Sequence, residues 1–142
     1  MQLSLVIARL NDRTPSFKKG GGAADLDAAL KGKLHNLPAW FVMPLTEAAQ
    51  PSRRTGVHSQ YITRAFAVVQ VLSNVRDMVG NSALVELDDA KEEVRAALIG
   101  WVPDPEVGEP VQFTGGRVLK FEDGRLWWSD EFQVSGFYRS TP

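Results

Sequence analysis

The segment Gln60–Ser73, which reads QYITRAFAVVQVLS, constrains the fold more than any other part of the sequence. It is rich in β-branched and aromatic residues and contains neither glycine nor proline, so it predicts one long strand. Side chains alternate along a strand. One face then carries Tyr61, Ala65, Ala67, Val69 and Val71, and the other carries Ile62, Phe66, Val68 and Leu72 together with Arg64 and Gln70. A strand that is apolar on both faces lies within a sheet, covered by other elements or by another subunit.

Length and charge narrow the classes of protein to consider. A chain of 142 residues is most simply one domain, spanning 1–142. With 16 basic and 17 acidic residues, the net charge is -1. This balance disfavours a protein that coats nucleic acid, but it is compatible with a ring through which DNA passes. Because cysteine is absent and no apolar segment approaches the about 20 residues of a membrane span, we expect a soluble protein made in a reducing cytoplasm.

Two segments near the N-terminus have helical periodicity. Apolar residues from Leu3 to Leu10 recur at the spacing of one face of a short amphipathic helix. The segment Asp25–Leu34 predicts a second, weaker helix with Leu26 and Leu30 on one side.

A third helix is expected from Ser82 to Ile99. Its apolar residues follow helical spacing, with Lys91 as the one polar member, and its acids lie mostly on the other side. Asn81 or Ser82 can cap its start. Gly100 and the proline that follows end it.

The remaining regular segments are strand-like. A short apolar run, Ala39–Pro44, predicts a buried strand that ends at the proline. The last third of the chain predicts three strands, at 111–113, 118–121 and 126–138. Asp123-Gly124, between the second and third of these, is a strong hairpin signal. The chain is therefore expected to be α+β with a mainly antiparallel sheet.

Between the first of these strands and the Gln60–Ser73 strand, the segment Thr46–Ser59 is expected to be a long polar loop. Loops of this length inside a compact domain are uncommon and tend to be functional. The loop contains the pair Arg53-Arg54. The pair is either solvated, paired with acids of a neighbouring subunit, or directed into a lumen through which DNA moves.

No set of residues indicates catalysis. His58 and Ser59 are adjacent, but neighbours on a strand face opposite sides and make a poor base–nucleophile pair. His35 is better explained by local packing or capping. The acidic pair Asp88-Asp89 is better explained by a solvated helix face than by a metal site. The run from Lys18 to Gly22 lacks the spacing of a phosphate-binding loop, so it is expected to be a flexible linker.

One large apolar residue of the last strand lies on the face that is otherwise polar. Trp127 shares a face with Ser129, Glu131 and other polar residues, although it is large and apolar. Either it is buried beneath a loop of its own chain, or it contacts another subunit, because aromatic residues are favoured interface anchors.

The order of these features resembles the tail terminator proteins of long-tailed bacteriophages. The resemblance covers more than 100 residues. In the first half of the chain it includes the N-terminal helix, the Gly-rich break before Ala23-Ala24-Asp25-Leu26, and the run Phe41-Val42-Met43-Pro44-Leu45 after Pro38. It continues with the central strand and the acidic helix that ends in Leu98-Ile99-Gly100-Trp101-Val102-Pro103. The pair Gly115-Gly116 and the run Leu126-Trp127-Trp128-Ser129-Asp130-Glu131-Phe132 complete it. The triple glycine and Arg53-Arg54 have no place in the family pattern.

The resemblance implies helices packed on one face of a mixed sheet. It also implies six copies in a ring at the head-proximal end of the tail tube, which stops tube growth and presents a surface to the head or neck. The expected partners are further copies of the chain, the tail tube protein, a head-completion or neck protein, and the sheath or tape-measure protein. DNA would pass through the lumen without sequence-specific binding, and the protein would belong to the virion, assembled in the host cytoplasm.

These inferences predict a structural protein with no catalytic, metal or cofactor residues and no membrane partner. The expected contacts with subunits or partners involve Arg53, Arg54, His58, Trp127 and Glu131. Another head–tail joining or tail completion protein of similar size is an alternative. A small hydrolase-type enzyme is a further alternative, which would need a pocket with convergent polar groups.

Overall fold

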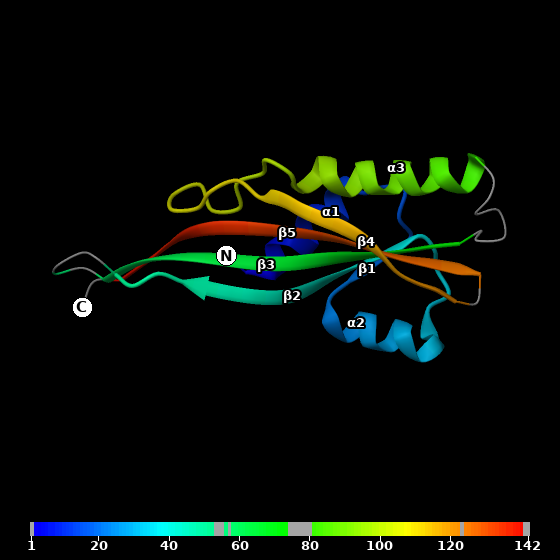
Figure 1. Cartoon of the computed structure of the whole chain (residues 1–142), viewed down its shortest axis with the longest axis horizontal. Coiled ribbons are helices and arrows are strands. Elements are labelled where there is room, and N and C mark those ends of the chain that lie inside the picture. The colour runs from blue at the N-terminus through cyan, green and yellow to red at the C-terminus, as the bar shows by residue number, and fades with distance from the viewer. Residues whose placement is uncertain (1, 53–55, 57, 74–80, 123, 141–142) are drawn as a thin grey trace.

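The computed structural model describes residues 2–52, 56, 58–73, 81–122 and 124–140, which form a mixed five-stranded sheet with three α-helices (Figure 1). The strands are β1 (Lys19–Gly21), β2 (Ala39–Ala49), β3 (His58–Leu72), β4 (Gln112–Glu122) and β5 (Arg125–Ser140). Their order across the sheet is β1-β2-β3-β5-β4. β1 is parallel to β2, and every other neighbouring pair is antiparallel. The expected α+β class is confirmed.

The apolar segment that begins near Gln60 forms the central strand β3, as its sequence predicts. β3 pairs with β2 on one side and with β5 along its whole length on the other. From Phe66 to Leu72 every residue is buried, which is the pattern of a strand covered on both faces.

One face of the sheet, here called the α1/α3 face, is covered by α1 (Leu3–Arg13) and α3 (Asn81–Leu98). Both helices follow the apolar periodicity of the sequence. Arg9 Nε, on α1, donates to the carbonyl oxygen of Ala97 at 2.9 Å and ties the two helices together. Gly100, at a φ of 85°, follows α3 as the expected stop. The core between helices and sheet contains Val6, Leu10, Trp40, Val42, Phe66, Val68, Val94, Leu98 and Phe132.

The opposite face, here called the α2 face, is covered at one end by α2 (Ala23–Ala28) and the following π-helical turn η1 (Ala29–Lys33) (Figure 1). The core beneath them contains Leu26, Ala29, Leu34, Phe41, Val69, Val71 and Trp127. This differs from the expectation of helices on one face only. The physical reason is that the buried end of β3 is apolar on both sides, so each side needs a cover.

The glycine run is not a flexible linker, because Lys19–Gly21 forms strand β1 beside β2. A Cβ on Gly20 would lie 2.1 Å from the ring of Trp40, so glycine allows that ring to pack against the strand. α2 begins at Ala23, two residues before the expected Asp25. Asp25 is the third residue of the helix, and its Oδ2 accepts a hydrogen bond from the backbone N–H of the N-cap residue Gly22 at 3.0 Å. Leu30 is 53% exposed, in contrast to its expected place beside Leu26, and Ala29 is buried instead.

The expected loop Thr46–Ser59 is shorter than predicted, because both of its ends belong to strands. β2 continues past Pro44 to Ala49, with a bulge between Pro44 and Thr46, and β3 begins at His58. Proline ends a central strand but is tolerated at a bulge on an open edge. Pro44 meets that condition, since β1 pairs with β2 only up to Phe41.

Candidate assembly surfaces

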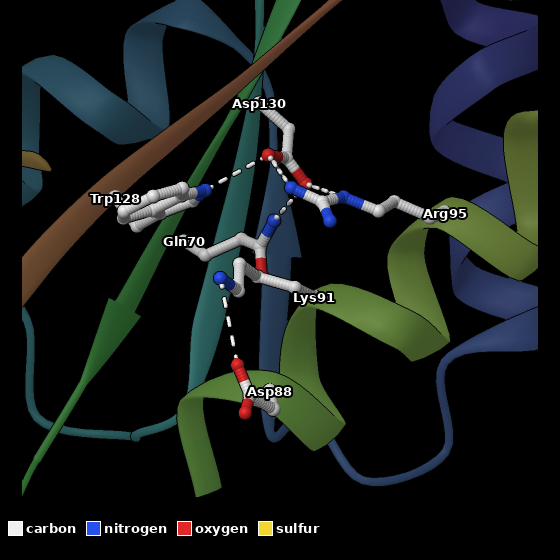
Figure 2. Close-up of polar contacts among 6 residues, drawn as sticks. All are labelled: Gln70, Asp88, Lys91, Arg95, Trp128 and Asp130. Atoms are coloured by element: carbon white, nitrogen blue, oxygen red, sulfur yellow. Dashed lines mark hydrogen bonds and ion pairs between the residues drawn. The ribbon is translucent and has the colours of Figure 1, made fainter. Parts of the chain in front are cut away.

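The most complete polar cluster in the described part of the chain surrounds the Asp130 carboxylate, which is 0% exposed (Figure 2). Arg95, on α3, donates from Nε to Oδ2 at 3.1 Å and from Nη2 to Oδ1 at 2.9 Å. Trp128 Nε1 donates to Oδ1 at 2.8 Å, and Gln70 Nε2 donates to Oδ2 at 3.2 Å. A carboxylate that accepts four hydrogen bonds is compensated for its burial.

This cluster fixes α3 to the centre of the sheet. Asp130 and Trp128 belong to β5 and Gln70 to β3, whereas Arg95 comes from α3, which packs against the sheet (Figure 2). The Lys91 ammonium lies 4.4 Å from the centre of the Trp128 ring and 3.6 Å from Asp88 Oδ1. Because the carboxylate is surrounded by its own chain, we interpret the cluster as structural and not as a reactive group.

The residues weighed for catalysis do not come together. His58 Nε2 lies 2.6 Å from Gln60 Oε1 on the exposed end of β3. Ser59 is buried, and its N–H donates to Ser52 Oγ. His35 is exposed at a distant place in the chain. Among the described residues, no three His, Asp or Glu side chains are grouped so that they could hold a metal ion, and no described helix is long and apolar enough to cross a membrane.

The five residues expected at subunit contacts have different surroundings. Arg53 and Arg54 lie outside the described residues. His58 is exposed, and Glu131 is partly exposed with Oε1 3.8 Å from Arg117 Nη2. Trp127 is only 4% exposed. Of its two alternatives, the structure shows burial within its own chain, beneath the α2 segment, with the Lys120 ammonium 4.7 Å from its ring.

Beyond α2, a stretch of the α2 face carries no helix. Its side chains are small or neutral, and the Thr63 and Ser135 hydroxyls lie 2.8 Å apart at its centre. The face alternation of the paired strands assigns to this surface Thr46, Ala48, Thr63, Ala65, Gln133 and Ser135. We call these six residues the uncharged strip. The same alternation places charged side chains at its two ends, with Glu131 and Arg117 at one end and Arg139 at the other.

The edge strand β4 is exposed along most of its length on both faces. Four of its large apolar residues are between 37% and 48% exposed: Phe113, Val118, Leu119 and Phe121. In the described structure β4 pairs only with β5. A long, apolar, unpaired edge is a template for pairing with another chain. The sequence predicted two strands here, at 111–113 and 118–121, whereas the structure has one strand that continues through Gly115 and Gly116, because β5 pairs with both halves. The sequence gave no sign that both faces of this strand are open.

A groove of about 570 Å³ lies between α3 and the segment that joins α1 to β1. Phe17, Leu72 and Val85 contribute apolar surface, and Glu86, Asp89 and Glu93 contribute acids from α3. Glu93 Oε1 accepts a hydrogen bond from the N–H of Ser16. The acids lie along one helix and do not converge on a point, so the groove resembles a contact surface more than an active site.

Comparisons with known proteins agree with a structural role. A family model described as "Phage tail terminator protein" matches residues 1–141. Among solved structures, a chain of the "Virion of native gene transfer agent (GTA) particle" is 16% identical, and the match covers 92% of this chain and 93% of that chain with a TM-score of 0.50. At this identity the likeness shows the fold. No curated protein matches the chain.

Proposed function

Since the chain belongs to the phage tail terminator family and is therefore a structural protein of the phage tail, we propose that it forms a ring on the head-proximal end of the tail tube. The ring, of six copies as the resemblance implies, ends the polymerisation of the tube and offers the surface to which the head or neck attaches. The protein would act by assembly and not by catalysis.

The observation that carries the proposal is the apolar surface that the chain leaves exposed at the edge of its sheet. Helices bury one end of the sheet, whereas β4 keeps four large apolar residues exposed at the sheet's edge. Exposed apolar surface of this kind marks contacts with other proteins. The buried Asp130 cluster holds the sheet and α3 rigid, so the monomer can present that edge in a fixed orientation.

A ring stops a tube by having two different ends. Each tube ring offers an end that accepts another ring, whereas a terminator matches the tube on one end and differs from it on the other. Closure of the ring requires two different complementary patches on each copy, since the contacts run head to tail. Tail tube protein would bind one end. A head-completion or neck protein would bind the other, and sheath or tape-measure protein would lie nearby.

The uncharged strip of the α2 face fits the lumen of such a ring. Thr63, Ala65, Gln133 and Ser135 offer no cation to hold phosphate groups, and strong phosphate binding depends on Lys and Arg. DNA could then move past the strip without being retained or read. In this proposal the protein belongs to the neck end of the virion and is assembled in the cytoplasm of the bacterial host.

Imaging of growing tubes tests the proposal. Tail tube protein polymerised in the presence of the purified chain should give tubes of limited length with a density at one end, and tubes polymerised without it should be longer and uncapped. The chain denatured before addition serves as the control. Tubes that grow without limit and carry no cap would contradict termination. A density at a different site on the tail would favour another joining role.

The loop between β2 and β3 supplies one lateral contact or part of the lumen in this proposal. Changing Arg53 and Arg54 together to Glu is expected to prevent ring formation while the monomer stays folded, because the reversed charges repel the acids that the arginines would meet. The matched control reverses two exposed cations elsewhere, Arg13 and Lys18. If the Arg53/Arg54 variant forms rings as the native chain does, the role assigned to the loop is wrong.

A further inference from the structure

The five-stranded sheet has two open edges on opposite sides. β4 forms one edge over its whole length. At the other, β1 covers β2 only from Ala39 to Phe41, and from Val42 to Ala49 no described strand pairs with the outer side of β2. In Figure 1 this part of β2 extends well past β1 and α2. Unpaired edges of this length are normally shortened, charged or covered in a protein that remains a monomer. Pro44 and the bulge beside it limit pairing at one point of the β2 edge, and the other residues from Val42 to Ala49 retain their backbone N–H groups.

We propose that β4 of one copy pairs with the open part of β2 of the next copy, so that the sheets of all copies join into one continuous closed sheet. This inference rests on the proposed ring and names the contact that closes it. The occupant of each edge is thus a second copy of this chain, attached head to tail.

The directions of the strands favour this pairing. β2 and β3, β3 and β5, and β5 and β4 are each antiparallel, so β4 and β2 of one copy run in opposite directions. Rotation about a ring axis that lies along the strands leaves their directions unchanged. β4 of one copy therefore meets β2 of the next in the antiparallel arrangement, whose hydrogen bonds are the better aligned.

The two edges can also be compared in their position along the strand direction and in their exposed side chains. Through the registers of β3 and β5, Gln112 is level with Thr46 and Gly116 with Val42, before any stagger that closure of the ring imposes. Each edge exposes a leucine to a similar degree, 46% for Leu45 and 45% for Leu119. The registers place Leu119 level with the part of β2 that β1 covers, so the two leucines approach each other only through the stagger of neighbouring copies. The charged residues of the two edges have partners within the chain: Glu47 lies 2.8 Å from Arg64 Nε, and Lys120 lies 2.7 Å from Glu122 Oε2.

Joined in this way, every copy presents the same face to the axis. With the α1/α3 face on the outside of the ring, the α2 face would lie on the inside, with the uncharged strip at one end of the lumen and α2 and η1 at the other. A closed sheet has no edge left, so the ring cannot grow sideways once it is complete. This gives a physical reason for a fixed copy number.

Cysteine cross-linking tests the contact directly, because the native chain has no cysteine. Single cysteines are placed on β4 at Thr114, Arg117 or Leu119 and on β2 at Leu45, Glu47 or Ala49, and each β4 position is combined with each β2 position. Each variant is treated with a short bifunctional thiol reagent, free in solution and on capped tail tubes. We expect at least one double variant to give a denaturant-resistant ladder of multimers, and every single variant to stay monomeric.

The outcomes separate this inference from the proposed function. Rings or capped tubes in which no combination cross-links would overturn the strand pairing and leave termination standing. Efficient cross-linking of a single variant to itself would also overturn it, because a head-to-tail contact never brings a residue against its own copy. Ladders from protein that does not cap tubes would support the pairing and contradict termination. If neither ladders nor capped tubes are seen, both the strand pairing and the proposed termination are contradicted.

Three exposed leucines provide a matched substitution series. Leu45→Lys and Leu119→Lys place a charge on the two open edges, which blocks strand addition. Leu30→Lys makes the same change at a residue that is 53% exposed but belongs to η1, away from both edges. We expect each edge variant to weaken ring assembly by about tenfold or more and Leu30→Lys to leave it unchanged. Equal effects from all three variants would overturn the assignment.

Discussion

The two ends of the sheet have different surroundings, although the same strands run through both. At the Phe66–Leu72 end of β3, helices cover both faces and every residue is buried. At the other end, from His58 to Ala65, the α2 face carries no helix. There His58 is exposed, Ser59 is buried and the remaining residues are partly exposed. The covered end stabilises the monomer. In the proposed ring the open end and the β4 edge contact other chains, so stability and assembly would depend on separate regions.

The largest difference in the free energy of unfolding is expected between alanine substitutions of two phenylalanines of β5. Phe132 is 0% exposed and stacks on Phe66 with the ring centres 5.5 Å apart. Phe137 is 40% exposed and touches Tyr61 edge to face. Phe132→Ala should lower the free energy of unfolding by about 3–5 kcal/mol, and Phe137→Ala by about 1 kcal/mol, both measured by urea denaturation. Equal losses would mean that the two ends do not differ as described.

The next contrast concerns two adjacent acids of β5. Asp130→Ala leaves Arg95, Trp128 and Gln70 without their buried acceptor, and we expect a loss of about 3 kcal/mol in the free energy of unfolding. Glu131→Ala removes only a long, partly exposed contact with Arg117 and should cost less than about 1 kcal/mol. If thermal and urea denaturation show similar losses for both variants, the Asp130 cluster does not hold α3 on the sheet.

Alanine substitutions of two glycines test the same difference between the covered and open parts of the sheet. A Cβ on Gly20 would collide with the Trp40 ring, whereas a Cβ on Gly115, in the open strand β4, meets nothing within 4 Å. Gly20→Ala should destabilise the monomer by about 1–3 kcal/mol. Gly115→Ala should change it by less than about 1 kcal/mol, in either direction. A destabilising Gly115→Ala in the monomer would show that β4 is covered after all.

The smallest effect is expected at the tip of the open edge strand. The Lys120 ammonium, 2.7 Å from Glu122 Oε2, lowers the pKa of that fully exposed carboxyl. Because the folded-state pKa lies below the unfolded value, the stabilisation from this pair is present above the unfolded pKa and is lost as the pH falls through the folded pKa. An NMR titration of Glu122 should show the lowered pKa, and Lys120→Met should raise it toward its ordinary value. An unchanged pKa in the variant would exclude Lys120 as the cause.

Several elements follow from local sequence because local forces decide them. The composition of Gln60–Ser73 predicts β3, the periodicity of the acidic helix predicts α3, and the spacing around Asp123-Gly124 predicts the β4–β5 hairpin, whose described ends pair as Glu122 with Arg125. The polar cluster left a partial signal. Gln70 and Arg64 share an otherwise apolar face of β3, and Lys91 is the one polar member of the apolar face of its helix. These patterns did not identify Asp130 or Arg95 as parts of the cluster.

Other features depend on partners far away in the chain. Three consecutive glycines have no strand propensity, and β1 forms because β2 and the Trp40 ring lie beside it. Pro44 ends a strand by local rules, yet β2 continues because a bulge at an open edge accommodates it. Trp127 looked misplaced on a polar face until α2 and η1 were found to cover it.

By itself, the sequence determined the α+β class, the central strand, the family resemblance that the family match confirms, and the absence of cysteine chemistry, because composition and short-range periodicity encode these properties. Only the tertiary structure decided which apolar residues are used within the chain and which remain exposed. That choice depends on where α2 ends and on which strand lies at the edge of the sheet, and both are set by long-range packing. The same alternation of apolar residues therefore gives a buried core at one end of the sheet and an open surface at the other.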